Sequence, residues 1–335
     1  MTVLDRNQLT ASAVFSDPLR RGLSSSSSVA FSLLGTSLRL ESNSALVIAA
    51  ARESFGSFGD QEEGAGDFLL EVLVDPELQE AADRTTVYRA HGDYVHIACG
   101  SSFGVADLRR RLSWALVTSG LAADSSYLRN SLLDCLFYVQ IMRWTHTPVH
   151  CAAVGSGDRS VLICGCSGAG KSTLAYACLK LGLQLFTDDV AYLCLASDGD
   201  RLLMWGNPWH LRLLPDCPSL FPELASTRPR PRAGHEPCVE ISVARCFPRA
   251  PRSSSQPLAL VFLNPGCRKE DAALEPLSQS WAFERLQSDI ILDYEPVVQR
   301  HQAVLRRLTT VPCYRLSAAA DPLVTASVLG RLLDS

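Results

Sequence analysis

The most constraining feature of the sequence is the stretch "GCSGAGKS", Gly165 to Ser172, which matches the pattern G-x-x-x-x-G-K-[ST] at every defined position. The apolar run "SVLIC" precedes it, and the helix-forming stretch "STLAYACLKLG" follows it. A strand that leads through a glycine-rich loop into a helix is the setting in which this pattern binds phosphate. The sequence therefore predicts a phosphate-binding loop within an α/β fold.

The residue types in this motif match what phosphate binding requires. Gly165, Gly168 and Gly170 let backbone N–H groups close around phosphate oxygens where a Cβ atom would clash or would forbid the dihedral angles. Lys171 can reach the terminal phosphates, and the Ser172 hydroxyl can ligate magnesium at the start of the helix. Nucleotide binding is therefore the firmest functional prediction from the sequence.

Two adjacent acids, Asp188 and Asp189, interrupt the otherwise apolar stretch "LQLFTDDVAYLCL" (183–195). A buried carboxylate without a positive partner is costly, so the pair either breaks a strand or binds a cation. The acids follow Lys171 by 17 residues, enough for a helix, a turn at Gly182 and one strand whose end lies beside the phosphate loop. We expect one carboxylate to hold magnesium and the other to face an acceptor hydroxyl; the alternative is that one of them only caps the turn.

His150, in "TPVHCAAV", precedes Gly165 by 15 residues. Antiparallel pairing of this run with "SVLIC" across the turn "GSGDRS" would carry His150 toward the phosphate end of the sheet. The sequence leaves two interpretations open, a catalytic histidine and a satisfied core residue.

The pattern of the chain predicts three parts. Residues 1–29 end in the serine run "RGLSSSSSV" and are predicted to be a flexible lead-in. Residues 30–144 are predicted to form a smaller α+β domain: short alternating runs indicate antiparallel strands, and residues 105–144 show helical spacing in two segments, the second starting at Asp124. Residues 145–335 are predicted to form the domain that carries the phosphate loop.

Further patterns in the last part predict individual elements. These are a strand pair around a Gly-Asn-Pro turn at 201–216, a loop at 225–238, a buried strand at 258–265 closed by Asn-Pro, and helices at 278–292 and 321–335 with a strand at 311–317 between them. Because the buried strand ends in Asn264 and not in an acid, it offers no competing magnesium ligand.

Composition limits the class of protein. The 335 residues are 47% hydrophobic and 20% charged, the balance of a globular chain. The net charge of −4 provides no basic field, so we expect no binding to nucleic acid or to an anionic membrane. The twelve cysteines form no CxxC pair and no zinc spacing, which favours reduced thiols. With neither a secretory signal nor an apolar run of spanning length, a cytoplasmic location is predicted.

Taken together, "HCAAV", "GCSGAGKST" and "FTDDVAYL" resemble the C-terminal catalytic domain of the HPr kinase/phosphorylase family and of HPr-kinase-related kinases. The resemblance covers residues 145–215 well and 216–330 in outline. It implies a P-loop kinase domain with a mixed sheet, the fold shared with phosphoenolpyruvate carboxykinase, which uses ATP and Mg²⁺ to phosphorylate a serine hydroxyl.

The resemblance also implies a role for each matching residue. Asp189 would be the general base toward the acceptor, His150 would assist it, and Ser172 and Asp188 would hold Mg²⁺, although the two aspartates could exchange roles. Lys171 would act on the transferred phosphoryl group. The nucleotide would be bound by Gly165, Cys166, Ser167, Gly168, Ala169, Gly170, Lys171, Ser172 and Thr173.

Two departures narrow the resemblance. Thr173 stands where HPr kinases have Glu, and Cys151 stands where they have Gly. The β-rich N-terminal part and the segments "GNPWHLRLLPD" (206–216) and "VPCYRLS" (311–317) look more like the related kinases, some of which phosphorylate serine on ribosomally made peptides such as lasso-peptide precursors. In that setting Arg212 and the loop residues Arg228, Arg230 and Arg232 would clamp phosphate or an acidic substrate; the alternative is that they are only solvated.

The function predicted from the sequence is an ATP-dependent, Mg²⁺-requiring kinase that acts on a serine of a peptide or small protein. Two alternatives stay open: a kinase for a small-molecule alcohol, and a nucleotide-gated binding module with little or no catalysis. The sequence identifies neither the acceptor nor the oligomeric state, and a homo-oligomer is compatible with it.

Overall fold

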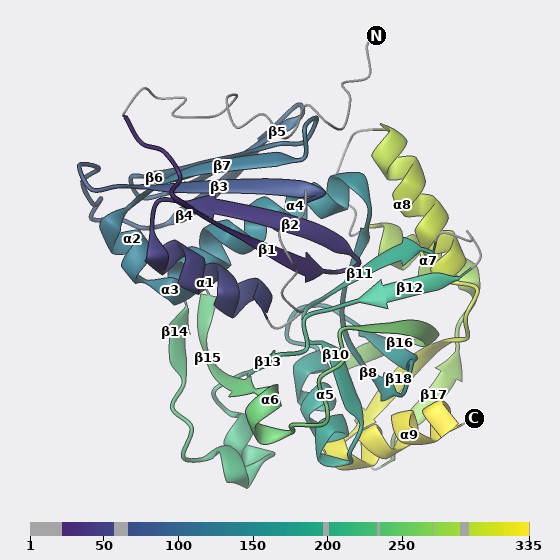
Figure 1. Cartoon of the computed structure of the whole chain (residues 1–335). Helices are drawn as coiled ribbons and strands as arrows, with labels where there is room; N and C mark the ends of the chain where they lie inside the picture. The colour runs from purple at the N-terminus through teal and green to yellow at the C-terminus, as the bar shows by residue number, and fades with distance from the viewer. Residues whose placement is uncertain are drawn as a thin grey trace. The chain divides into compact units, whose positions relative to one another are not determined.

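The computed structural model of the chain describes residues 22–56, 66–196, 201–232, 235–269, 271–288 and 295–334. Contacts separate the chain into two compact units, an N-terminal unit (Met1–Trp144) and a C-terminal unit (Thr145–Ser335). Figure 1 shows the helices and strands of both.

The N-terminal unit begins its regular structure at Ser27, within the segment 1–29 that was predicted to be a lead-in; residues 1–21 lie outside the described residues. In chain order its elements are β1 (Ser27–Leu33), β2 (Thr36–Ser42), α1 (Ala45–Phe55), β3 (Phe68–Asp75), β4 (Thr86–His91), β5 (Tyr94–Cys99), β6 (Ser102–Asp107), β7 (Leu112–Thr118), α2 (Ser119–Ala123), α3 (Ser125–Leu128), a π-helical turn (Arg129–Leu133) and α4 (Asp134–Trp144).

The seven strands form one sheet in the order β1-β2-β3-β7-β6-β5-β4. The prediction of purely antiparallel strands is wrong, because β3 pairs in parallel with both β2 and β7. Helix α1 makes the β2–β3 crossover, and a parallel pair needs such a connection. Its alanine-rich sequence, "ALVIAAARESF", is a strong helix former that the strand prediction overlooked.

The helices α1 and α4 cover one face of this sheet. Four phenylalanines join them to the strands in edge-on contacts: Phe31 lies 5.6 Å from Phe55, Phe55 lies 5.6 Å from Phe137, and Phe137 lies 6.0 Å from Phe68. On the opposite face the buried residues form a smaller cluster around Trp114. The sheet is therefore apolar on both sides at its centre.

This two-sided burial explains a second wrong prediction. Residues 105–118 were expected to be helical, and they form the end of β6 and all of β7. Every residue of β7 is buried, because the strand lies between β3 and β6. A strand buried on both faces loses the alternation that identifies strands in a sequence.

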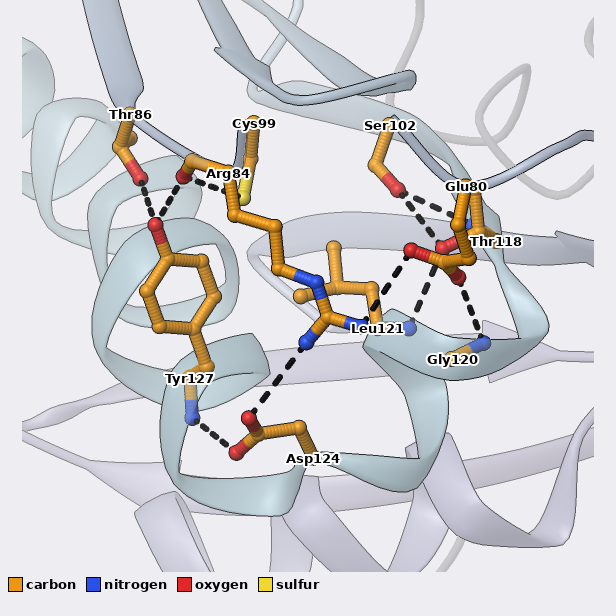
Figure 2. A network of polar contacts seen from close by, with 10 residues as sticks. All are labelled: Glu80, Arg84, Thr86, Cys99, Ser102, Thr118, Gly120, Leu121, Asp124 and Tyr127. Atoms are coloured by element: carbon orange, nitrogen blue, oxygen red, sulfur yellow. Dashed lines mark hydrogen bonds and ion pairs between the residues drawn. The ribbon is translucent and has the colours of Figure 1, made fainter. Parts of the chain in front are cut away.

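A polar network ties the start of the edge strand β4 to α2 and α3 (Figure 2). The Tyr127 hydroxyl donates to the Arg84 carbonyl oxygen and lies 3.2 Å from the Thr86 hydroxyl. The Arg84 guanidinium lies 3.3 Å from the Glu80 carboxylate and 3.6 Å from that of Asp124. Asp124 also caps α3 by accepting from the Tyr127 N–H group at 3.1 Å, which confirms the predicted start signal.

The C-terminal unit is built as a mixed α/β structure with two sheets. In chain order its elements are β8 (Thr147–Ser156), β9 (Arg159–Cys164), α5 (Lys171–Lys180), β10 (Gln184–Thr187), β11 (Val190–Leu195), β12 (Leu202–Trp205), β13 (His210–Leu213), two 3₁₀ turns (Cys217–Ser219 and Pro222–Leu224), β14 (Arg230–Arg232), β15 (His235–Ser242), α6 (Val243–Cys246), β16 (Ser254–Lys269), β17 (Ala273–Pro276), α7 (Gln279–Gln287), α8 (Glu295–Leu308), β18 (Cys313–Ala319) and α9 (Pro322–Asp334).

The larger sheet has eight strands and both directions, so the predicted α/β fold with a mixed sheet is confirmed. Strand β8 is antiparallel to β9 on one side and to β10 and β11 on the other. Strand β16 continues the sheet beyond β9 and is parallel to both β9 and β18. Helices α5 and α9 pack on one face, and α7 and α8 pack on the other. The strand before the loop and the strand after α5 therefore run in the same direction but are separated by β8.

Three predictions for this unit are wrong in detail. The strands β12 and β13 do not form a hairpin around the Gly-Asn-Pro turn, because β12 joins the large sheet and β13 pairs with β15 in a three-stranded sheet. The predicted loop at 225–238 contains β14 and the start of β15. Strand β16 continues past Asn264 to Lys269 because its end pairs with β18 beyond a register shift. The end of the predicted helix 278–292 lies outside the described residues from residue 289.

None of the helices in the described ranges combines the length and the apolar character needed to cross a membrane. The cysteines whose side chains the structure describes are free thiols.

Glu71 makes the stability of the N-terminal unit depend on pH. Its side chain is buried beside Glu41 on the neighbouring strand, and burial, reinforced by the Glu41 charge, raises the pKa of its carboxyl from 4.5 to about 7. The folded state therefore holds the proton more tightly than the unfolded state, and stability is lost as the pH rises from 4.5 through 7. Glu71→Gln should remove this loss and leave the variant up to about 3 kcal/mol more stable than the parent at pH 8.5.

The measurement is the free energy of unfolding in urea at pH 4.5 and pH 8.5. At pH 4.5 the two proteins should differ little. Glu284→Gln, which neutralises an exposed carboxylate on α7, serves as the control and should change neither value. An equal effect of Glu71→Gln at both pH values would contradict the assignment.

Candidate functional site

Residues 165–170 form a tight loop between β9 and α5. Gly168 and Gly170 have φ values of 77° and 98°, the left-handed region that favours glycine. A Cβ atom on Gly165 would lie 3.1 Å from the Cβ of Ala169 and 3.4 Å from that of Leu263, so the loop packs closely on itself and on β16. The backbone conformation at Gly168 and Gly170 and the close packing at Gly165 therefore favour glycine at these three positions.

Lys171, the first residue of α5, folds back over the loop. Its Nζ atom donates to the carbonyl oxygens of Gly165 at 2.9 Å and Cys166 at 3.0 Å, and the side chain is only 7% exposed. The ammonium is thus held at the mouth of the loop, where an anion would compete with the two neutral carbonyls for it. Of the predicted nucleotide-binding residues, those that line the adjoining cavity are Ser167, Gly168, Ala169, Gly170, Lys171, Ser172 and Thr173.

Asp188 follows β10 and turns inward. Its Oδ2 atom accepts from the backbone N–H of Arg212 at 2.8 Å. Its Oδ1 atom is fully buried and has no hydrogen-bond partner among the described residues. Burial raises the pKa of this carboxyl to about 6, and the Arg212 N–H and the Ser172 hydroxyl offset part of that rise. The site therefore contains one buried acceptor atom that the protein itself does not satisfy.

Asp189 turns outward toward the cavity, with its side chain 69% exposed. Its Oδ1 atom lies 3.3 Å from the Nδ1 atom of His150. Hydrogen bonding from His150 lowers the pKa of Asp189, so its carboxylate is ionised at neutral pH. The two neighbouring acids thus have different surroundings, one buried and one paired with an imidazole.

Strand pairing explains how His150 reaches this position. Cys151 pairs with Cys164, the last residue of β9, which confirms the predicted antiparallel pairing. On its other side β8 places His150 opposite Val190. The imidazole is 41% exposed, so the alternative of a buried core histidine is excluded.

A cavity of about 610 Å³ joins these groups. Its floor is the loop 167–173. One side is formed by His150, near the start of β8, and by Asp188 and Asp189, which follow the end of β10. The other side follows β16 and β18 and is lined by Leu263, Ala318, Ala319, Ala320, Pro322 and Thr325. Residues of β13, β15 and the chain after β13 complete the wall, with Leu214, Asp216 and Glu236 exposed there.

The four arginines that were predicted to bind phosphate or an acidic substrate do not lie together. Arg212 lines the cavity, but its Nε atom lies 3.5 Å from the Glu240 carboxylate across the β13–β15 pair. Arg228 is exposed and does not line the cavity. Arg230 and Arg232 lie on β14, and their side chains lie outside the described part of the structure. Of the two arginine side chains in this set that the structure describes, Arg212 lies beside the predicted site and Arg228 does not.

The residues present fit a magnesium ion. Magnesium is usually held by one or two carboxylates together with phosphate oxygens and waters. The described residues contain no group of three or more His, Cys, Asp or Glu side chains that could hold a metal alone. The unsatisfied Oδ1 atom of Asp188 and the nearby Ser172 hydroxyl are the donor set expected for an ion whose other ligands come from a nucleotide.

Sequence reasoning missed the wall that follows β16 and β18. A general signal for it existed, because ligands bind at the carboxyl ends of parallel strands and a strand had been predicted at 311–317. Glu240, which pairs with Arg212, carried no signal, since the register of β13 with β15 alone brings the two together.

Comparison with known proteins gives little further information. No protein-family model matches the chain, and no curated protein matches its sequence. Among solved structures, the HPr(Ser) kinase/phosphatase from Coxiella burnetii is similar with a TM-score of 0.31 and 17% sequence identity, over 55% of this chain and 95% of that chain. A TM-score this low supports no argument about function, so any functional conclusion depends on the geometry of the site.

Asp188→Asn separates metal binding from stability. The substitution removes a buried charge and keeps an acceptor for the Arg212 N–H, so the protein without ligand should be at least as stable as the parent. Magnesium with a non-hydrolysable ATP analogue, at a hundred times the Kd, should stabilise the parent by about 3 kcal/mol, and this gain should disappear in the variant.

Thermal unfolding with and without magnesium and the analogue measures both effects. Asp216→Asn is the matched control, because it removes an exposed carboxylate from the same cavity and should keep the ligand-induced gain. Full magnesium-dependent stabilisation of Asp188→Asn would show that Asp188 does not hold the metal.

Proposed function

We propose that the C-terminal unit is an ATP-dependent, Mg²⁺-requiring kinase that phosphorylates a serine hydroxyl of a peptide or small protein. One observation carries the proposal: an ionised carboxylate, Asp189, supported by His150, faces the same cavity as the glycine loop and Lys171. A base, a phosphate cradle and a cation within one cavity are the groups that phosphoryl transfer requires.

The proposed reaction is an in-line displacement. The acceptor oxygen bonds to the γ-phosphorus, its proton passes to the Asp189 carboxylate, and the bond from the γ-phosphorus to the β–γ bridging oxygen breaks so that ADP leaves with that electron pair. Magnesium bound by Ser172 and Asp188 would supply charge neutralisation on the phosphates. Lys171 and the loop N–H groups bind the same oxygens, and His150 orients the carboxylate and stabilises its charge.

The order of strands supports an orientation for the donor. Across the sheet, the residues at this edge come in the order Asp188 and Asp189, His150, the loop, Leu263, and then 318–320. An in-line reaction places the acceptor and the leaving group on opposite sides of the transferred phosphorus. With the acceptor at Asp189, the nucleoside lies on the side of β16 and β18.

The direct test of the kinase proposal incubates the protein with γ-labelled ATP, magnesium and a panel of serine peptides. Label on peptide serine, absent from the matching alanine peptides, is expected. Asp189→Asn should lower kcat by at least about a hundredfold while nucleotide affinity is kept, because only proton transfer is removed. Label on small alcohols alone would favour a small-molecule kinase, and nucleotide binding without any transfer would favour a binding module.

Ala320→Phe tests the orientation of the nucleotide. Ala320 is exposed on the cavity wall, so the larger side chain should leave the fold intact and occupy the space assigned to the nucleoside. Affinity for ATP should fall at least about tenfold, whereas affinity for inorganic tripolyphosphate should stay unchanged. Isothermal titration with magnesium measures both.

Val324→Phe, an exposed position on α9 that does not line the cavity, is the matched control and should alter neither affinity. Unchanged ATP affinity in Ala320→Phe would place the nucleoside elsewhere. If the unsubstituted protein bound neither ATP nor tripolyphosphate, the phosphate-loop assignment itself would fail.

A further inference from the structure

The edge strand β4 of the N-terminal unit has an open side. It ends the seven-stranded sheet, and within the described ranges its one pairing partner is β5. From Val87 to His91 every residue is exposed, and the strand has no proline or lysine. Proline and lysine on an edge strand are among the devices with which proteins prevent the edge from pairing with another chain.

The hairpin fixes which backbone groups face this open side. A two-residue turn at Gly92 and Asp93 joins β4 to β5, and His91 pairs with Tyr94 across it. Residues that flank a two-residue turn exchange their hydrogen bonds, and the pattern alternates along the strands. The N–H and C=O groups of Tyr88 and Ala90 therefore point to the open edge, where an added strand could pair with them.

Apolar side chains gather at this hairpin. Of the nine large apolar side chains that are exposed in the described residues, three lie on β4 and β5, namely Val87, Tyr88 and Tyr94. Val87 pairs with Ala98, which pairs with Phe103, so these three share one face of the sheet. Together with their neighbours they line a hollow of about 380 Å³.

Two basic side chains, Arg89 and His96, line this hollow and have no acidic partner among the described residues. Arg89 lies directly opposite His96 and both line the hollow, on the face that also carries Val87. Neither makes an ion pair or a hydrogen bond within the described ranges of the chain. Arg84, in contrast, lies between two carboxylates at the start of the same strand (Figure 2).

Two acids at the turn end of this hairpin are already engaged. Asp93, in the β4–β5 turn, contacts Arg143 at 2.9 Å and Arg109 at 3.6 Å. Asp107, opposite Tyr94, contacts Arg110 at 3.7 Å. The charge of Arg89 is therefore not neutralised by these side chains.

We propose that the β4 edge binds an extended peptide segment with acidic side chains, which adds to the sheet as an eighth strand. Backbone hydrogen bonds to Tyr88 and Ala90 would supply affinity, and contacts of alternate acidic side chains with Arg89 and His96 would supply selectivity. The Tyr127 network holds the start of β4 in place, so little ordering of the strand accompanies binding.

Charge argues against a second copy of this chain as the occupant. Pairing β4 with β4 would bring the Arg89 guanidinium groups of two copies to one edge, and like charges on neighbouring strands are unfavourable. An acidic segment removes this repulsion. Peptide binding at the β4 edge does not require nucleotide binding. This proposal can therefore be correct whether or not the C-terminal unit is a kinase.

The test measures binding of two fluorescein-labelled ten-residue probes to the full-length protein by fluorescence anisotropy. One probe alternates Thr and Glu, and the other alternates Thr and Lys. The acidic probe should bind at least about tenfold more tightly. Arg89→Glu should reverse this preference, and Ala90→Pro, which blocks the open edge without removing a bond to β5, should weaken binding of the acidic probe at least about tenfold.

Arg249→Glu is the control for overall charge, because it makes the same change on an exposed residue of the C-terminal unit, and it should leave the preference as it is. Circular dichroism and thermal unfolding establish that each variant is folded. Equal effects of Arg89→Glu and Arg249→Glu, or unchanged binding by Ala90→Pro, would overturn the proposal. The proposal would also be overturned if neither probe bound and sedimentation showed a dimer that Ala90→Pro converts to a monomer. Tighter binding of a ten-nucleotide single strand than of the acidic probe would overturn it as well.

Discussion

The pairing of β8 with strands on both of its sides is the interaction on which the candidate site depends. One side of β8 pairs with β9, which leads into the glycine loop, and the other side pairs with β10 and β11, which flank the two aspartates. Because β9 and β10 are both antiparallel to β8, their carboxyl ends lie at the same edge, where β8 itself begins with His150 nearby. Phosphate loop, acids and histidine thus meet through backbone hydrogen bonds of one strand, and the site requires no long loop to assemble.

The same arrangement gives two adjacent acids opposite environments. Asp188 turns into the protein, where burial raises its pKa and leaves Oδ1 unsatisfied, while Asp189 turns to the cavity, where His150 lowers its pKa. Two carboxylates whose pKa values are moved in opposite directions are suited to different tasks. An unsatisfied buried oxygen is suited to a cation, and an exposed ionised carboxylate is suited to accept a proton. This contrast supports the division of labour that the sequence left open.

The sequence predicted the parts of the fold that depend on local pattern and failed where burial or pairing partners decide. The strand, loop and helix around Gly165, the β8–β9 pairing and the final helix follow from short motifs and turn residues. β7 was mistaken for a helix because burial on both faces removes its alternation. Strands β12 and β13 look like a hairpin in the sequence, yet they belong to different sheets, which only tertiary pairing determines. The hydrogen bond from the Arg212 N–H group to Asp188 could not be predicted either, because every residue type except proline carries a backbone N–H group.

A kinase that acts on a peptide has a general problem that the two proposed sites address together. A serine side chain offers few atoms for recognition, so affinity and selectivity must come from contacts remote from the reacting hydroxyl. An edge strand that binds extended segments recognises mainly backbone, and Arg89, which has no acidic partner among the described residues, adds a preference for acidic sequences. When both sites belong to one chain, binding at the edge raises the effective concentration of any serine that the same peptide can bring to the cavity. The length of peptide between its acidic segment and its serine then becomes a determinant of selectivity, independent of the chemistry at Asp189.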